Sequence, residues 1–328
     1  MSVSPADLLE SAGGDPFDLA GTPEQAIAAR SPLQLFWRRL RRDRVSMVSL
    51  GVIVLIAALA ILAPLVIQVT GVPGPNVQNS NLSDAFGVPQ GPTSAHPFGV
   101  DSLGRDVLAR VVYGARVSLE VGILATGIAV ALGILVGLLA GFYRGWVDTL
   151  LSRLVDVFLS FPILLLALGL ASACQLGSGC LGGLVKPGLT TVILVIALVN
   201  WTYIARIVRG QVLTLREKEF VEASRSLGAS NRRIIFREIL PNLVAPIIVY
   251  ASLLIPQNIL FESALSFLGV GVTEPTASWG AMIAQATSIF DSAWWFMLFP
   301  GLALLITVLA FNLLGDGLQD ALNPKDSR

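Results

Sequence analysis

The chain has 328 residues, of which 54% are hydrophobic and 13% are charged, and its 22 basic side chains balance 22 acidic ones. The polar residues gather between long apolar runs, which excludes an ordinary water-soluble globular domain. His96 is the single histidine, so a histidine-based metal or catalytic centre has nothing to be built from. We therefore expect an all-α, polytopic membrane protein with no metal site and no catalytic residue.

The N-terminal region divides into two parts. Residues 1–30 mix acidic side chains with Gly, Ala, Pro and Ser and hold few large apolar residues, which predicts a disordered cytoplasmic tail. No basic segment precedes an apolar one near Met1, which argues against a secretory signal. Residues 31–45 form a basic juxtamembrane segment, whose Arg cluster either sets the topology or binds anionic lipid headgroups.

Six apolar runs follow within residues 46–324, and each approaches the roughly 20 residues that a helix needs to cross a bilayer. Pro162 in the third run and Pro256 in the fifth are expected to kink their helices rather than end them. The predicted spans are residues 46–69, 118–143, 150–172, 188–208, 242–268 and 293–315.

Residues 96–119 follow a loop rich in Pro, Gly and Asn and show apolar residues at helical spacing. We predict a short amphipathic helix on the outer membrane face, with Arg105, Asp106 and Arg110 toward water. Such a helix is either a docking or gating surface or a simple lead into the second span. The outer segment 269–292 is open to the same two interpretations.

Small residues recur at every fourth position of the second span, at Gly133, Gly137 and Gly141. Backbones can approach closely along such a groove. We expect this face to pack against another span, in this chain or in a partner.

Two cysteines, Cys174 and Cys180, fall in the outer loop after the third span. A disulfide is permitted outside the cell and would stiffen this short loop modestly. A pair of free thiols is the alternative.

Polar residues inside a membrane are costly and are therefore functional candidates. Asn258, Glu262 and Ser266 repeat every four residues along the fifth span. They face either a water-filled passage or a hydrogen-bonded seam with another helix. Asn200 in the fourth span and Asn312 in the sixth are further candidates for the passage.

Two more polar positions lie in the third and fourth spans. Asp156 follows Arg153 by nearly one turn, which predicts a local ion pair. Tyr203 is one more candidate for contact with the passage.

A charged stretch at 215–242, LREKEFVEASRSLGASNRRIIFREILPN, interrupts the apolar runs. The pattern predicts a helical hairpin with a turn at Gly228, a second helix capped by Ser230, and an end at Pro241 and Asn242. One face of the first helix collects Phe220, Ala223, Ser224 and Leu227.

Basic residues mark the cytoplasmic side of a membrane protein. If the N-terminus is inside, the outer segments keep only Arg105, Arg110, Arg116 and Lys186 of the 22 Lys and Arg. Both termini, including the short tail 325–328, and the hairpin are then predicted to be cytoplasmic.

The lysines give no sign of a nucleotide site. A P-loop requires Lys after Gly, and the lysines here follow Val185, Glu217 and Pro324. If the chain is a transporter subunit, ATP must be hydrolysed on another chain.

The hairpin, with Glu222, Ala223, Gly228, Leu240 and Pro241 in this order, resembles the EAA loop of ATP-binding-cassette (ABC) importer permeases. From about Ser31 to Pro324 the chain resembles the C-type permease of dipeptide and oligopeptide importers. Further matching motifs are HPFGVDSLGRDVLARVVYGARVSL at 96–119, ESALSFLGVG at 262–271, SWGAMI at 278–283 and NLLGDGLQDALNP at 312–324.

This resemblance implies a type I importer permease in the cell membrane, paired with a second homologous permease chain. Two ATPase subunits would carry ATP and Mg, an extracytoplasmic binding protein would deliver substrate, and no nucleic acid would be involved. Ser224 and Glu238 depart from the family pattern and would tune how tightly the ATPases dock. The ATPase-coupling residues would be Glu222, Ala223, Ser224, Arg225, Gly228, Leu240 and Pro241.

The cargo implied is a di- or oligopeptide, with nickel complexes, glutathione or oligosaccharides as alternatives. An ion-coupled secondary transporter is a rival of another class, but it requires half-molecule repeats with broken helices and intramembrane ion ligands. A membrane scaffold is a further rival, for which the hairpin would have no purpose.

Overall fold

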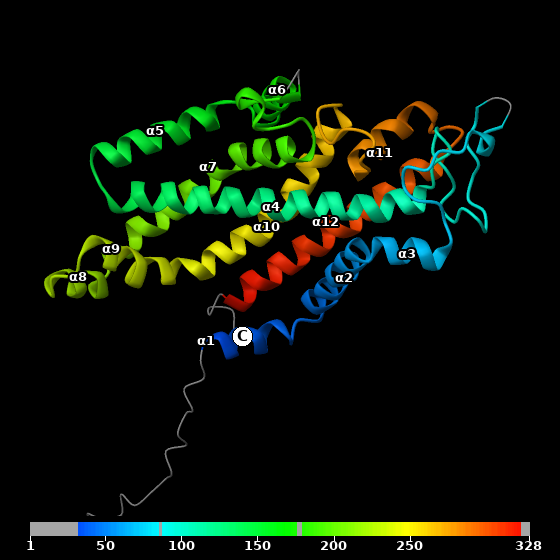
Figure 1. The fold of residues 1–328 in the computed structure, drawn as a ribbon. Coiled ribbons are helices and arrows are strands. Elements are labelled where there is room, and N and C mark those ends of the chain that lie inside the picture. The colour runs from blue at the N-terminus through cyan, green and yellow to red at the C-terminus, as the bar shows by residue number, and fades with distance from the viewer. Residues whose placement is uncertain (1–31, 85–86, 176–178, 323–328) are drawn as a thin grey trace, which may run out of the picture.

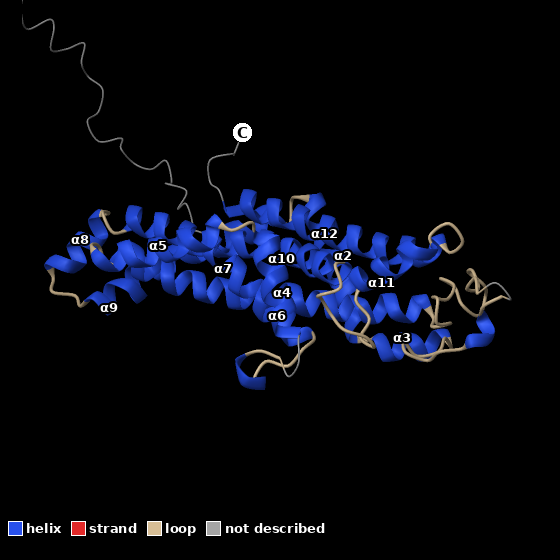
Figure 2. Ribbon diagram, turned by 90° about the horizontal axis from the view of Figure 1, so that it is seen from above, coloured by secondary structure: helices blue, strands red, loops and turns tan. Residues whose placement is uncertain are grey.

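The computed structural model describes residues 32–84, 87–175 and 179–322, and regular structure in these ranges is helical. Four long helices lie along one axis and form the framework of an elongated bundle (Figures 1 and 2). They are α4 (Val107–Phe142), α7 (Leu189–Leu215), α10 (Leu240–Phe267) and α12 (Trp294–Leu322). The predicted tails at 1–30 and 325–328 lie outside the described residues.

Shorter helices cover the sides and ends of this framework. In Figure 1, α8 and α9 lie at one end of the long axis, and α11 and the loop that precedes α4 lie at the other. The shorter helices are α1 (Pro32–Leu40), α2 (Arg44–Ile61), α3 (Ala63–Thr70), α5 (Trp146–Ser160), α6 (Ile163–Gln175), α8 (Glu219–Ser226), α9 (Asn231–Arg233) and α11 (Trp279–Ala286).

Helices α4 and α7 pack against each other over much of their length, and glycines allow their backbones to approach closely. A Cβ atom on Gly133 would lie 2.6 Å from Ile204 Cβ, and one on Gly137 would lie 2.7 Å from the carbonyl oxygen of Ala205. Gly141 meets α7 in the same way. The expectation that this face packs against another span is confirmed, and the partner helix is in the same chain.

Five helices of the described chain are long and apolar enough to cross a membrane, and a bent pair raises the number to six. That pair is α5 with α6, and its axes differ by 88°. The break falls at Phe161 and Pro162, because proline lacks an amide hydrogen and its ring crowds the preceding turn. The expected kink at Pro162 is thus a full helix end, whereas α10 runs unbroken through Pro256.

The first predicted span, 46–69, is also divided. Helix α2 begins after Asp43, whose carboxylate accepts the N–H groups of Val45 (3.0 Å) and Ser46 (3.3 Å). It ends at Ile61, and α3 restarts with a proline in its first turn.

Residues 96–119 do not form the separate surface helix expected from their pattern. Turns continue to Asp106, whose carboxylate accepts the N–H of Ala109 at 2.8 Å and caps α4. The first turns of α4 bury Val107 and Val111 against α11 and α12. The apolar face that suggested a membrane-surface helix is therefore covered by protein.

Candidate functional site

The turn between α8 and α9 is closed by backbone hydrogen bonds. The N–H of Ala229 donates to Ser224 O at 3.0 Å, and the N–H of Gly228 donates to Arg225 O at 2.9 Å. These two bonds define a Schellman motif, which needs a left-handed residue after the helix. Gly228 supplies it with φ of +79°, so the predicted turn lies where the sequence placed it.

Val221 attaches the hairpin to the bundle. It is fully buried and packs with Ile234 and Ile239, in a cluster that continues into Val208 and Val212 of α7. Because apolar side chains connect the hairpin to two long helices, a push on the hairpin is transmitted to both. Val221 was not among the residues singled out from the sequence, because its burial depends on Ile234 and Ile239, which follow the turn.

The opposite surface of the hairpin is open. Leu227 is 89% exposed, and Phe220 and Ala223 are exposed beside it. Glu222 and Arg225 are also exposed. A surface with exposed apolar and charged side chains, on a hairpin that is packed against the bundle, is suited to docking another protein.

The second half of the hairpin differs from the prediction. Ser230 Oγ accepts the N–H of Arg233 at 3.4 Å and caps α9, as expected. The chain then passes through a π-helical turn, Ile234–Ile239, directly into α10, so Pro241 and Asn242 do not end a helix. Proline is tolerated here because it stands in the first turn of α10, beside a widened π turn.

At the end of the bundle opposite the hairpin, a network of charged side chains joins three segments of the chain. Arg105 donates to Asp101 Oδ2 at 2.6 Å and to Glu274 Oε2 at 2.8 Å, and Arg110 donates to Glu274 Oε1 at 3.3 Å. Gln285 of α11 also donates to Glu274. The loop before α4, the start of α4 and the segment around α11 are thereby tied together.

This network corrects the expectation that Arg105, Asp106 and Arg110 point to water. They are 2%, 1% and 0% exposed, since arginines that meet carboxylates with good hydrogen-bond geometry can be buried. His96 is also buried and lies 2.9 Å from Asp106. The Asp101–Arg105 spacing of four residues was the sequence signal for this cluster.

Glu274 is the member of the network nearest to solvent. Burial alone would raise the pKa of its carboxyl, but hydrogen bonds from Arg105 and Gln285 and the charge of Arg110 outweigh it, so the pKa lies below its ordinary value. A surface depression of about 550 Å³ lies beside Glu274, and its lining includes Ser102 and Pro275.

The polar stripe of the fifth span lies inside the subunit. Asn258 donates to Thr126 Oγ1 of α4 and accepts from Asn200 Nδ2 of α7, both at 2.8 Å. Glu262 is fully buried and accepts the hydroxyl of Ser266 at 2.7 Å. The structure thus places four of the predicted passage residues, Asn258, Glu262, Ser266 and Asn200, in two hydrogen-bonded groups that join α10 to its neighbours. That any of them meets a passage stays a prediction.

Asn312 lies apart from these groups on α12, with its side chain half-buried. Tyr203 of α7 is 56% exposed. The local spacing predicted an ion pair between Asp156 and Arg153, and this prediction is wrong. Asp156 Oδ1 instead accepts a hydrogen bond from Arg206 Nη2 of α7 at 2.9 Å. The sequence could not show that α5 and α7 run together.

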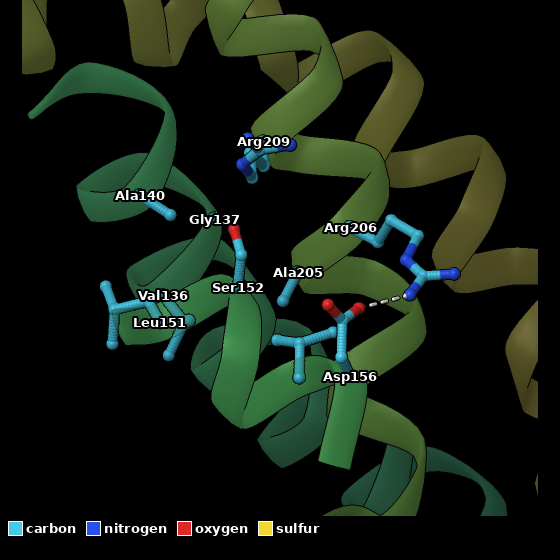
Figure 3. A pocket seen from close by; sticks show the side chains of 10 residues that line it. Val136, Gly137, Ala140, Leu151, Ser152, Asp156, Ala205, Arg206 and Arg209 are labelled. Carbon is cyan, nitrogen blue, oxygen red and sulfur yellow. Dashed lines mark hydrogen bonds and ion pairs between the residues drawn. The ribbon is translucent and has the colours of Figure 1, made fainter. Parts of the chain in front are cut away.

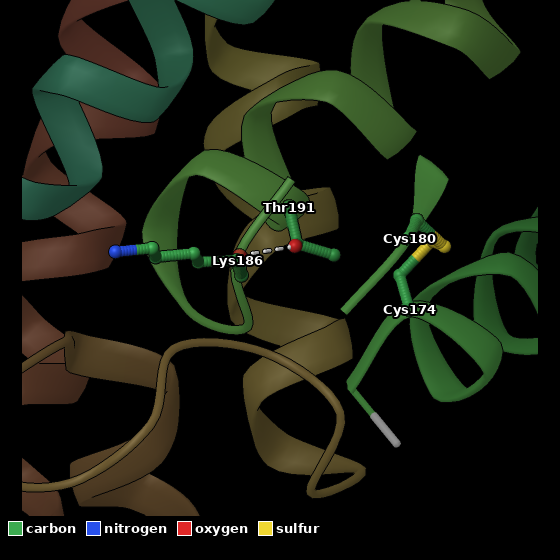
Figure 4. Close-up of a disulfide and its surroundings, with 4 residues drawn as sticks. All are labelled: Cys174, Cys180, Lys186 and Thr191. Atoms are coloured by element: carbon green, nitrogen blue, oxygen red, sulfur yellow. Dashed lines mark hydrogen bonds between the residues drawn. A yellow bond between two sulfur atoms is a disulfide. The ribbon is translucent and has the colours of Figure 1, made fainter. Parts of the chain in front are cut away.

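A disulfide joins Cys174, near the C-terminal end of α6, to Cys180 in the loop that follows (Figure 4). The side chain of the next residue, Gln175, donates to the carbonyl oxygens of Val270 (2.6 Å) and Gly271 (2.7 Å) just after α10. The cross-linked loop is therefore held against the start of the segment that leads to α11.

Two family models match the chain. The first describes the binding-protein-dependent transport system inner membrane component and covers residues 133–327. The second describes the N-terminal transmembrane domain of oligopeptide transport permease C and covers residues 31–84.

Curated relatives match over nearly their whole length. The dipeptide transport system permease protein DppC of Alkalihalophilus pseudofirmus is 40% identical over 92% of this chain and 93% of that protein. The glutathione transport system permease protein GsiD of Escherichia coli is 42% identical over 90% of this chain and 91% of that protein.

The fold has a match among solved structures. The inward-facing MetNI methionine ABC transporter contains a chain that superposes with a TM-score of 0.55 at 21% identity, covering 66% of this chain and 97% of that one. At this identity the likeness concerns the fold alone, which is that of type I ABC importer permeases.

Proposed function

We propose a mechanism for this chain, which belongs to the family of inner membrane components of binding-protein-dependent transport systems and is therefore a multi-pass permease of an ABC importer. It pairs with a second, related permease chain to enclose one passage. Two separate ATPase subunits drive the pair, and an extracytoplasmic binding protein delivers the substrate. The substrate is a di- or oligopeptide.

The exposed face of the α8–α9 hairpin carries this proposal. Val221 fixes the hairpin to α7 and α10, while Leu227 projects into solvent with almost no contact to its own chain. An ATPase that grips this face would move both helices together. The predicted coupling residues Glu222, Ala223, Ser224, Arg225, Gly228, Leu240 and Pro241 belong to this hairpin or to the turn that follows it.

The cargo is inferred from the relatives. DppC is named for dipeptides and GsiD for glutathione, and both cargoes carry an ammonium group and a carboxylate on a peptide-like backbone. Glutathione is therefore the second candidate. The relatives reported above lend no support to nickel complexes, oligosaccharides or an ion-coupled mechanism.

The orientation proposed for the chain follows the basic residues. Both termini and the hairpin face the cytoplasm, where the ATPases would be, and the Glu274 network with its depression faces outward. This outer surface is our candidate for contact with the binding protein. In Figure 1 the hairpin and α11 lie at opposite ends of the bundle, as this arrangement requires.

A pair of exposed leucines tests the ATPase contact. Leu227 in the hairpin and Leu184 in the outer loop are 89% and 85% exposed, so neither substitution to Asp should disturb the fold. We expect Leu227→Asp to abolish both co-purification of an ATPase with the chain and dipeptide uptake, and Leu184→Asp to preserve the ATPase. Equal ATPase recovery with both variants would contradict the proposed coupling surface.

A further inference from the structure

An ion pair joins α5 and α7 on an open face of the subunit. Arg206 Nη2 donates to Asp156 Oδ1 at 2.9 Å, and the two side chains remain 59% and 51% exposed (Figure 3). In Figure 3 they point toward each other across the gap between the two helices. Charged side chains exposed on this face need a neighbour that tolerates charge.

The position of the pair makes lipid an unsuitable neighbour. Arg206 lies near the inner end of the predicted fourth span, 188–208, whereas Asp156 lies six residues, about 9 Å at 1.5 Å per residue, inside the start of the predicted third span, 150–172. Exposed charges at such depth are rare in hydrocarbon and normally face a water-filled cavity or another protein chain.

Other exposed faces of the subunit have a different composition. The open sides of α2 and α12 present large apolar side chains, as contact with lipid requires. They include Val48, Val54, Leu55, Leu298, Leu302 and Leu305. On the second half of α7, by contrast, the exposed residues that carry a side chain are polar: Tyr203, Arg206, Gln211 and Thr214.

A cavity of about 260 Å³ adjoins the pair, between α4, α5 and α7. Arg209 also lines this cavity, but it is already paired, because it donates to both carboxylate oxygens of Asp148 at 2.6 and 2.9 Å. Arg206 donates one hydrogen bond to Asp156, and a guanidinium has five N–H donors. Arg206 and Asp156 therefore keep capacity for further charged partners.

We propose that the Asp156–Arg206 pair lines the passage and binds zwitterionic peptides in transit, Arg206 taking the carboxylate end and Asp156 the ammonium end. The fork of Arg matches a carboxylate with two parallel hydrogen bonds, and Asp accepts from an ammonium group. When a zwitterionic peptide binds, the Asp156–Arg206 pair is replaced by two pairs, one between Arg206 and the peptide carboxylate and one between Asp156 and the peptide ammonium group. No charge is then left unpaired while the peptide passes. This inference rests on the proposed peptide permease and names the part of its wall that meets the cargo.

Thiol labelling of the complete transporter tests whether the pair faces water, whatever the cargo. The two native cysteines are joined in a disulfide, so an introduced thiol is the reactive one in this chain. We expect Arg206→Cys and Asp156→Cys to react with a charged, membrane-impermeant methanethiosulfonate at least tenfold faster than Leu305→Cys, a 60% exposed residue of α12. Rates as slow as that of Leu305→Cys would overturn the assignment of this face to the passage.

Peptides with one blocked end test the binding role. In proteoliposomes with the binding protein at saturation, Arg206→Gln should lower the uptake rate of a free dipeptide about tenfold and leave that of its C-terminal amide unchanged. Asp156→Asn should act in the same way on the free and N-acetylated dipeptides. Leu298→Ala, on the exposed apolar side of α12, should leave all rates unchanged.

An equal fall for free and blocked peptides would show that the ion pair only stabilises the subunit, and it would overturn the inference. If the unmodified transporter takes up no dipeptide, the peptide assignment fails here and in the proposed function, while fast labelling at position 206 still identifies the passage wall. If the unmodified transporter takes up dipeptides but the cysteines at positions 156 and 206 react slowly, this inference fails while the proposed function stands.

Discussion

Ser266 Oγ donates to Glu262 Oε1 at 2.7 Å and at the same time accepts the backbone N–H of Val272 at 3.1 Å. Glu262 also accepts the hydroxyl of Ser118 on α4 at 3.3 Å. One buried carboxylate therefore connects α10, α4 and the start of the outer segment that contains α11. Such a seam fixes how the outer segment sits on the spans.

Replacement of Glu262 by Leu is expected to destabilise the subunit by about 1–3 kcal/mol, since it leaves buried hydroxyl groups without an acceptor. Glu262→Gln keeps an acceptor oxygen and should change the turnover rate while the complex still assembles. Thermal unfolding and dipeptide uptake of the purified transporter measure both effects. The exposed neighbour Gln257 supplies the control as Gln257→Leu, and a similar loss there would argue against the seam.

Substitution of Gly228 should uncouple transport without preventing membrane insertion. No atom lies within 4 Å of a Cβ built there, so the obstacle is the φ of +79°, which costs an L-residue roughly 1–2 kcal/mol and is forbidden to proline. We expect Gly228→Pro to abolish uptake and Gly228→Ala to reduce it. Gly127→Ala, in open space on α4, is the control; normal uptake by Gly228→Pro contradicts the coupling role.

Gly137→Ala is expected to destabilise the subunit by about 1–3 kcal/mol, the usual effect of overpacking. The new Cβ would lie 2.7 Å from the carbonyl oxygen of Ala205, and backbone atoms of α7 cannot rotate away. The midpoint of thermal unfolding in detergent measures the change. Gly169→Ala on α6 meets nothing within 4 Å and should be neutral, so equal midpoints for the two variants would refute the close-packing explanation.

The outer network predicts an acid-dependent loss of stability. The lowered pKa of Glu274 means that its ion pairs stabilise the folded chain fully above the ordinary value of 4.5, and that this contribution disappears as the pH falls through the folded pKa. The carboxyl side chain is 46% exposed, so the effect is at most about 1 kcal/mol.

Thermal unfolding as a function of pH checks this. Glu274→Gln should be less stable than the unmodified chain at pH 7, and the two should converge at pH values well below 4.5. Asp291→Asn, an exposed acid outside the network, is the control. A difference that persists undiminished in acid would mean that the carboxylate charge is not the source of stability.

Features that depend on local sequence were predictable. Composition and run length indicated a polytopic helical protein, and a glycine at the end of an amphipathic run indicated the turn at Gly228, because a left-handed helix cap has a strong local preference. The stripe Gly133, Gly137, Gly141 indicated close packing for the same kind of reason, since only glycine lets two backbones meet.

Features that depend on which helices become neighbours were not predictable. From the sequence we predicted that Asp156 pairs with Arg153 and that Arg105 and Arg110 are exposed to water, because periodicity indicates only the contacts within one helix. The tertiary structure places Asp156 against Arg206, and it buries Arg105 and Arg110 against Asp101 and Glu274, with Arg105 and Glu274 169 positions apart in the chain. Charge burial is decided by such distant partners, so the amino-acid order specified the helices, while their packing decided which charges are buried and which remain exposed.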